Sequence, residues 1–125
     1  HADAGTVRKG YEFNVPLRHT VVAAKKGTLP ASYSFFQVDS PAVVLDTVKK
    51  AEADDSIILR LYEAHGGRAR ARLVTPLPVR SVVECDTLER KTVGRPVRPR
   101  NGTVELTFAP FEIKTLKLKL GRGRR

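Results

Sequence analysis

The chain lacks methionine and tryptophan, has a single cysteine and contains no long apolar run. Cys85 has no partner for an intrachain disulfide, which suits a reducing compartment, and its strand-like segment VVECD favours a structural role in the core. Without about 18 consecutive apolar residues, the sequence shows no membrane span, and no signal peptide is visible near its start. Because the chain begins with His1 and has no methionine, we expect a cleavage product or an excised piece of a longer protein.

The net charge of +10 raises the question of nucleic-acid binding. Most of the excess lies in residues 91–100 and 114–125. In the second segment lysines alternate with leucines, which is typical of a solvated strand face, and the first segment, KTVGRPVRPR, has the proline and glycine content of a loop. Neither segment contains an aromatic residue on which a base could stack. We therefore interpret the charge as solvated surface, with nucleic acid not expected as a partner.

The length of 125 residues fits one domain. Residues 3–14 predict a short helix, with Asp3 or Thr6 as the cap and Val7 and Tyr11 on one face. From residue 34 onward, strand-like runs alternate with turn signals about every eight to twelve residues, which is the rhythm of an all-β sandwich. The sequence therefore predicts an all-β fold, an antiparallel β-sandwich with a short N-terminal helix over residues 1–120, followed by a basic flexible tail at 121–125.

Period-two alternation assigns the faces of the predicted strands. Residues 43–64 predict a hairpin, and in RARARL, residues 68–73, the arginines face water while alanine and leucine face the core. Asn101-Gly102 predicts a chain reversal, and residues 79–85 predict a strand that follows a kink or lies at an edge. The residues predicted to face the core across the sandwich are Ile57, Leu59, Leu61, Val104, Leu106 and Phe108.

The last strand carries an irregularity. Phe111 and Ile113 share one parity, whereas Leu116, Leu118 and Leu120 share the other, so a regular strand cannot place both sets on one face. Two explanations stay open at this point. Either both faces are buried at the start of the strand, or a bulge near residues 114–115 shifts the register.

The residues that carry chemistry form no recognisable catalytic set. Most carboxylates lie in predicted turns or on wet strand faces, and only Glu84 and Asp86 share a strand face, about 7 Å apart, where chance is the simpler explanation. The histidines His1, His19 and His65 show no zinc-site spacing. The sequence has no phosphate-binding glycine loop and no GxSxG nucleophile elbow.

Several ordered segments nevertheless carry a family resemblance. These are DAGTVRKGYEFNVPL at 3–17, LRLYEAHGG at 59–67, CDTLER at 85–90 and PFEIKTLKLKL at 110–120. Together they resemble the C-terminal β-sandwich of the family 38 glycoside hydrolases, the α-mannosidases, and in particular the cytosolic-type branch. The loop GRPVRPRNG and the tail GRGRR have no counterpart in that resemblance, so nothing functional is carried onto them.

The resemblance implies a parent protein that is a retaining α-mannosidase acting on terminal α-linked mannose of oligomannosides or glycans in the cytoplasm. It implies a zinc ion and an aspartate nucleophile in an N-terminal catalytic domain, with no catalytic or metal residue and no cofactor in this chain. The module would buttress that catalytic domain, its partner within the same protein. The loop His65, Gly66, Gly67 and Arg68 would contact the catalytic domain or sugar, unless it is an ordinary hairpin turn.

Two further functions stay open. An independent carbohydrate-binding module would suit a β-sandwich, although the shortage of aromatic residues and the absence of tryptophan weigh against it. A basic nucleic-acid-binding domain would rest on charge alone.

Overall fold

A computed structural model describes residues 4–121 of the chain, which form two units, 1–33 and 34–125. The first unit contains the helix α1, Thr6–Asn14. The residue at its N-cap is Gly5, in a left-handed conformation with φ 61°, and no side chain caps the helix. The predicted cap at Thr6 is therefore wrong, and Asp3 lies outside the described residues. Val7 and Tyr11 share a half-buried face, as predicted.

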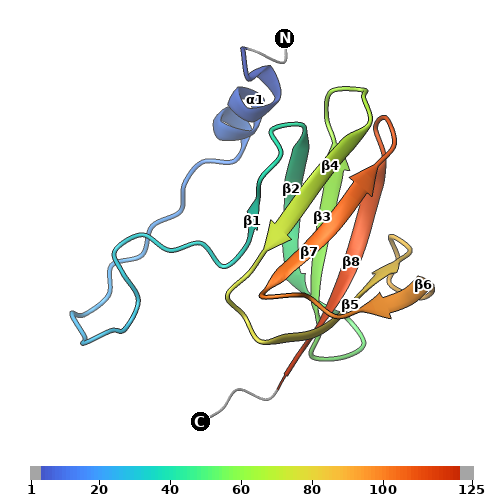
Figure 1. The fold of residues 1–125 in the computed structure, drawn as a ribbon. Coiled ribbons are helices and arrows are strands. Elements are labelled where there is room, and N and C mark those ends of the chain that lie inside the picture. The colour runs from blue at the N-terminus through green and yellow to red at the C-terminus, as the bar shows by residue number, and fades with distance from the viewer. Residues whose placement is uncertain (1–3, 122–125) are drawn as a thin grey trace. The chain divides into compact units, whose positions relative to one another are not determined.

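The second unit is an antiparallel β-sandwich, which confirms the predicted fold class. Figure 1 shows the shorter sheet in front of the longer one, with β7 crossing in front of β8. Every strand pair within the two sheets is antiparallel. In spatial order the three-stranded sheet consists of β1 (Gln37–Val38), β4 (Ala69–Val74) and β7 (Thr103–Phe108), and the five-stranded sheet of β2 (Val43–Lys50), β3 (Ile57–Glu63), β8 (Ile113–Leu120), β5 (Val79–Cys85) and β6 (Thr92–Val97).

The core lies between the two sheets and follows the predicted alternation. Leu59 and Leu61 on β3 are fully buried against Leu73 of β4 and Phe108 of β7, because period two brings these side chains to the facing surfaces. The predicted inward residues Ile57 and Leu106 are partly buried and pack on the same cluster. The arginines of β4 are exposed, as predicted.

Two strands depart from the predictions made for them. Residues 92–97, predicted as part of a loop, form β6, an edge strand of the five-stranded sheet whose residues are all exposed. Its neighbour β5 lies between β8 and β6, so the edge alternative for residues 79–85 is wrong, whereas the irregular register between Val79 and Ser81 fits the predicted kink. Proline and glycine at Gly94 and Pro96 disguised β6, since both are tolerated at a sheet edge.

The Asn101-Gly102 reversal is confirmed. Both residues have positive φ, 49° and 73°, and the backbones of Arg100 and Thr103 exchange hydrogen bonds of 3.0 and 2.9 Å across the turn. The reversal carries the chain from β6 in one sheet to β7 in the other. A β-carbon at Gly102 would collide with the carbonyl oxygen of Thr75, so only glycine fits there.

Neither explanation for the irregularity in the last strand is correct. The pairing of β8 with β3 runs without a register shift from Leu118 to Ile113, which excludes a bulge at residues 114–115. Burial of both faces is excluded as well, since Phe111 is 69% and Ile113 65% exposed. These two apolar side chains lie on the surface of the domain, and the leucines alone follow the core.

The outer face of the five-stranded sheet, which points away from the other sheet, is partly covered by the β2–β3 loop (residues 51–56) and the β5–β6 loop (residues 86–91). Asp54 and Glu89, one from each loop, bind Lys117 and Lys49 of the sheet at 2.9 and 2.8 Å. Cys85 is buried on this face, where burial raises the pKa of its thiol. This agrees with the predicted structural role of the cysteine.

Candidate functional site

The predicted contact loop connects β3 to β4 at one end of the sandwich, beside the β7–β8 loop (residues 109–112) (Figure 1). Backbone hydrogen bonds fix its start. The amide of Glu63 donates to the carbonyl of Glu112 at 3.0 Å, and the amide of Ala64 donates to the carbonyl of Ala42 at 2.8 Å. His65, Gly67 and Arg68 are exposed, whereas Gly66 is half-buried. The loop is therefore anchored at its base and open to solvent at its tip.

A buried carboxylate organises both loops. Glu63 is the last residue of β3 and is 1% exposed. Its carboxylate accepts hydrogen bonds from the backbone N–H groups of His65 at 2.8 Å, Gly66 at 2.8 Å and Phe111 at 3.0 Å. Burial alone would raise the pKa of Glu63, but these backbone N–H groups outweigh it and hold the pKa below its ordinary value. The charged carboxylate thus joins the tip of the predicted loop to the β7–β8 loop.

Gly66 and Phe111 are the point at which the two loops touch. Gly66 has φ 75°, and a β-carbon there would lie 2.6 Å from Cζ of Phe111. Phe111 itself adopts φ 58°, a conformation that L-residues with bulky side chains rarely take. Its amide bond to Glu63 supports this backbone, so a largely exposed aromatic ring is held in one place above the loop.

Phe111 stands next to a row of apolar side chains on the outer face of the five-stranded sheet. Tyr62 pairs with Ile113 on β8 and with Val44 on β2, so the three side chains lie side by side across three strands. We call Val44, Tyr62, Phe111 and Ile113 the outer apolar row. Exposed apolar surface of this kind, built on rigid strands, is typical of a contact surface.

On the other side of the loop, Arg68 borders a hollow of about 770 Å³ between β4, β7 and the start of β8. Lys114 lines it with a side chain that is only 13% exposed, and its Nζ binds Glu84 at 3.1 Å and Glu112 at 2.9 Å. The same ammonium lies 5.8 Å from the centre of the Phe108 ring. Burial alone would lower the pKa of Lys114, but the two carboxylates raise it, so the lysine stays charged and paired.

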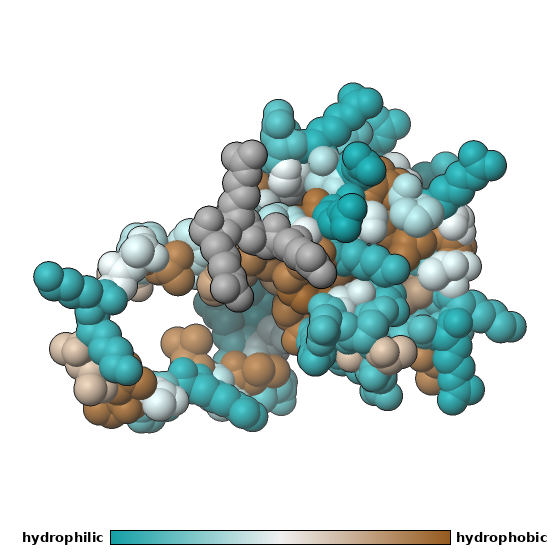
Figure 2. Space-filling model, turned by 90° about the horizontal axis from the view of Figure 1, so that it is seen from below, coloured by the Kyte–Doolittle hydropathy of each residue, from teal (hydrophilic) through white to brown (hydrophobic). Residues whose placement is uncertain are grey.

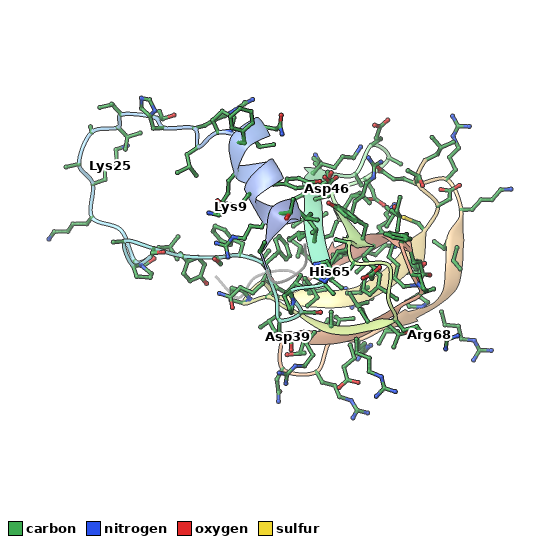
Figure 3. The ribbon with its side chains drawn as sticks, turned by 90° about the horizontal axis from the view of Figure 1, so that it is seen from above. Lys9, Lys25, Asp39, Asp46, His65 and Arg68 are labelled. Carbon is green, nitrogen blue, oxygen red and sulfur yellow. The ribbon has the colours of Figure 1, made fainter. Side chains whose placement is uncertain are left out.

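The four predicted site residues form two separate positions. His65 and Gly66 belong to the glutamate-held tip, whereas Arg68 belongs to the hollow beside β4. Figure 3 labels His65 and Arg68 apart from one another at this end of the sandwich. The four residues show no convergent geometry for a reaction, and the arrangement they do have, a rigid tip beside exposed apolar side chains, suits binding to a surface.

The carboxylates Glu84 and Asp86, weighed as a pair from the sequence, have separate structural partners. Glu84 accepts from Lys114, while the Asp86 carboxylate accepts from the backbone amides of Arg90 at 2.7 Å and Lys91 at 3.2 Å. Over residues 4–121, no three histidine, cysteine, aspartate or glutamate side chains gather as metal ligands. The zinc that the resemblance implies therefore has no ligand set among these residues, and no chemical step is derived through it here.

Sequence reasoning missed the residues that build the site. Glu63 and Glu89 were predicted among solvent-facing carboxylates, which is wrong for both, since Glu63 is 1% exposed and the Glu89 side chain 7%. One signal was present: Glu63 has the inward parity of Leu59 and Leu61 and directly precedes the loop with its glycine pair. No comparable signal marks Phe111, because its conformation depends on a carboxylate 48 residues away in the chain.

Comparison with known families places this fold. The chain belongs to the glycosyl hydrolases family 38 C-terminal beta sandwich domain, whose family model matches residues 42–116. It is 41% identical over 121 residues to alpha-mannosidase 2C1 of Homo sapiens and 38% identical over 122 residues to that of Mus musculus. It is also 29% identical over 118 residues to alpha-mannosidase G of Dictyostelium discoideum.

These matches cover 94%, 94% and 91% of the chain but only 11%, 12% and 11% of the three relatives, so the chain spans about a tenth of their length. None of the described helices is long and apolar enough to span a membrane.

Proposed function

We propose that this chain is the non-catalytic C-terminal module of a retaining α-mannosidase that hydrolyses terminal α-linked mannose from oligomannosides or glycans. The observation that carries the proposal is the 41% identity that extends over 94% of the chain to a protein named as an alpha-mannosidase. The family model, which describes a C-terminal β-sandwich, supports the modular role. The parent acts in the cytoplasm, in keeping with the resemblance to the cytosolic-type branch and with an unpaired, buried cysteine.

In this proposal the chemistry belongs to the catalytic domain of the parent, which supplies the aspartate nucleophile and the ligands of the zinc ion. Zinc would act there as a Lewis acid on the substrate. The present chain supplies structural support, and its partner is the catalytic domain of the same protein.

The glutamate-held loop end is the surface we assign to this contact. The amide bonds to Glu63 fix the tip at His65 and Gly66, and the outer apolar row offers Phe111 and Ile113 at 69% and 65% exposure. A pre-ordered apolar surface binds without the entropy cost of ordering a mobile loop. Burial of these side chains against the catalytic domain would remove apolar area from water and so stabilise the assembled enzyme.

The test uses an aryl α-mannoside with added zinc or cobalt and three samples: the parent protein, the purified 125-residue chain and a mock preparation. The parent is expected to release the aryl group, whereas the chain alone is expected to match the mock preparation. Turnover by the chain alone would contradict a non-catalytic module, and an inactive, folded parent would contradict the mannosidase assignment.

A further inference from the structure

The two sheets leave two strand edges on the same side of the sandwich, and these edges differ in how they are protected. β6 ends the five-stranded sheet and carries Gly94 at φ 75° and Pro96, which has no backbone donor. β7 ends the three-stranded sheet, where within residues 4–121 it pairs with β4 alone. Natural edge strands are usually blunted by proline, charge or bulges. β7 has no proline and no register shift, and Glu105 is its one charged residue, so it is an open edge.

The open edge of β7 runs beside a groove. Because the three-stranded sheet is narrower, β6 extends beyond β7, as Figure 1 shows, and its residues stay exposed. Val93 and Val97 of β6 are each 57% exposed and face the groove together with Val104 and Leu106 of β7. The hollow there is about 220 Å³ and continues, through shared residues Val97 and Val104, into a second hollow of about 420 Å³. An extended segment lying along β7 would cover both valines.

The rim of this groove is basic. Arg95 lines the first hollow, and Arg98 and Arg100 line the second. Within the described part of the chain, the side chains of these three arginines form no ion pair with a carboxylate. Figure 2 shows long hydrophilic side chains projecting from the sandwich with hydrophobic surface visible between them. This charge favours an acidic occupant and disfavours a second copy of the same basic edge.

We propose that β7 accepts an extended, acidic segment of the parent protein as a fourth strand of the three-stranded sheet. The inference rests on the proposed function, since it takes the occupant from the parent chain. The relatives offer ample chain for this role, because the matched region is only about a tenth of their length. Strand addition would satisfy the free backbone groups of β7, bury Val93 and Val97, and pair the rim arginines with carboxylates of the added segment.

Amide hydrogen exchange of the parent and of the 125-residue chain, followed by mass spectrometry, tests this directly. In an edge strand, alternate amides point away from the sheet and exchange readily. We expect exchange across residues 103–108 to be at least about tenfold slower in the parent than in the chain alone. Equal exchange in the two samples would overturn the inference. Protection in the chain alone that grows with its concentration would overturn it in favour of a second copy.

Two variants of the parent separate the groove from general surface effects. Val97→Asp with Arg98→Glu places negative charge where the acidic strand would lie, and we expect it to abolish the protection of residues 103–108. The matched control is Val48→Asp with Arg90→Glu, because Val48 is 53% exposed on β2 and Arg90 is exposed in the β5–β6 loop. Protection that survives the first pair, or is lost equally with the control pair, would contradict the groove.

Mannosidase activity measured on the same parent sample keeps the two proposals apart. An active parent whose β7 exchanges freely contradicts strand addition and leaves the proposed function standing. An inactive parent with a protected β7 contradicts the mannosidase assignment and leaves the strand addition standing.

Discussion

Glu63 and Glu89 are both glutamates with nearly buried side chains, yet they are held by different groups. Glu63 is held by backbone N–H groups of two loops at the end of the sandwich. Glu89 lies on the outer face of the five-stranded sheet, where Lys49 binds it at 2.8 Å and the amide of Glu52 donates to it at 3.2 Å. The side-chain bond to Lys49 is the main reason that the pKa of Glu89 is lowered.

The difference separates shape from attachment. A carboxylate that accepts several backbone N–H groups dictates the path of those loops, since each amide must point at it. An ion pair fixes two side chains but leaves the backbone between them less constrained. The Glu63 end of the domain is therefore the one with a predetermined surface, and the Glu89 face is a cover over the sheet.

The largest expected effect comes from Glu63→Ala. It would leave the amides of His65, Gly66 and Phe111 without their acceptor, and each buried unpaired donor is costly. We expect the melting temperature of the chain to fall by roughly 15–20 °C. Glu63→Gln keeps one acceptor oxygen and should lose about half as much. Thermal unfolding followed by circular dichroism measures both, and a loss below that of Glu89→Ala would reverse the comparison.

Glu89→Ala should have the second-largest effect. It removes the partner of Lys49, whose own side chain is 31% exposed and able to regain water. We expect the melting temperature to fall by roughly 8–15 °C, because one charged hydrogen-bond network is lost but few backbone donors are stranded. A double-mutant cycle with Lys49→Ala isolates the pair. Strict additivity in that cycle would show that the ion pair contributes nothing.

Gly66→Ala should have a smaller effect. The left-handed backbone at φ 75° and the Phe111 ring both resist a β-carbon, although the ring can move aside. We expect a fall in melting temperature of about 4–8 °C, set by the backbone conformation. Gly67→Ala is the matched control, since a β-carbon there meets nothing within 4 Å. Equal effects at the two positions would contradict the described loop.

Acid pH should distinguish the amide-held carboxylate by the smallest effect. The pKa of Glu63 is lowered on folding, so its contribution is complete above the ordinary value of 4.5 and is lost as pH falls through the lower folded pKa. Glu63→Gln has no such titration. The stability gap between wild type and Glu63→Gln should therefore narrow as pH is lowered below 4.5, in denaturant titrations at a series of pH values. A constant gap would show that the buried group is not ionised.

Alternation predicted the strand faces because it depends only on neighbours in sequence. Leu59, Leu61 and Phe108 took the faces that period two assigned to them, and the arginines of β4 faced water. The tail at 121–125 lies largely outside the described residues, which end at 121.

The site was less predictable because its contacts are long-range. The position of Phe111 depends on Glu63, and the strand β6 depends on pairing with β5 that outweighs its glycine and proline. Phe111 and Ile113 appeared to be core residues of a shifted strand, whereas they are exposed. Apolar residues on the surface look the same in sequence as apolar residues in a core, and only the fold separates them.

The most direct test of the docking surface is the rate at which heat inactivates the parent's mannosidase activity. The variant Phe111→Ser with Ile113→Ser removes the exposed apolar side chains beside the Glu63 loop end. Its control, Leu88→Ser with Val48→Ser, removes side chains that are 67% and 53% exposed elsewhere on the domain. The first pair is expected to inactivate at least about threefold faster than wild type while the control does not, since lost interface contacts mainly speed dissociation. Equal half-lives for the two pairs would contradict docking through this end of the sandwich.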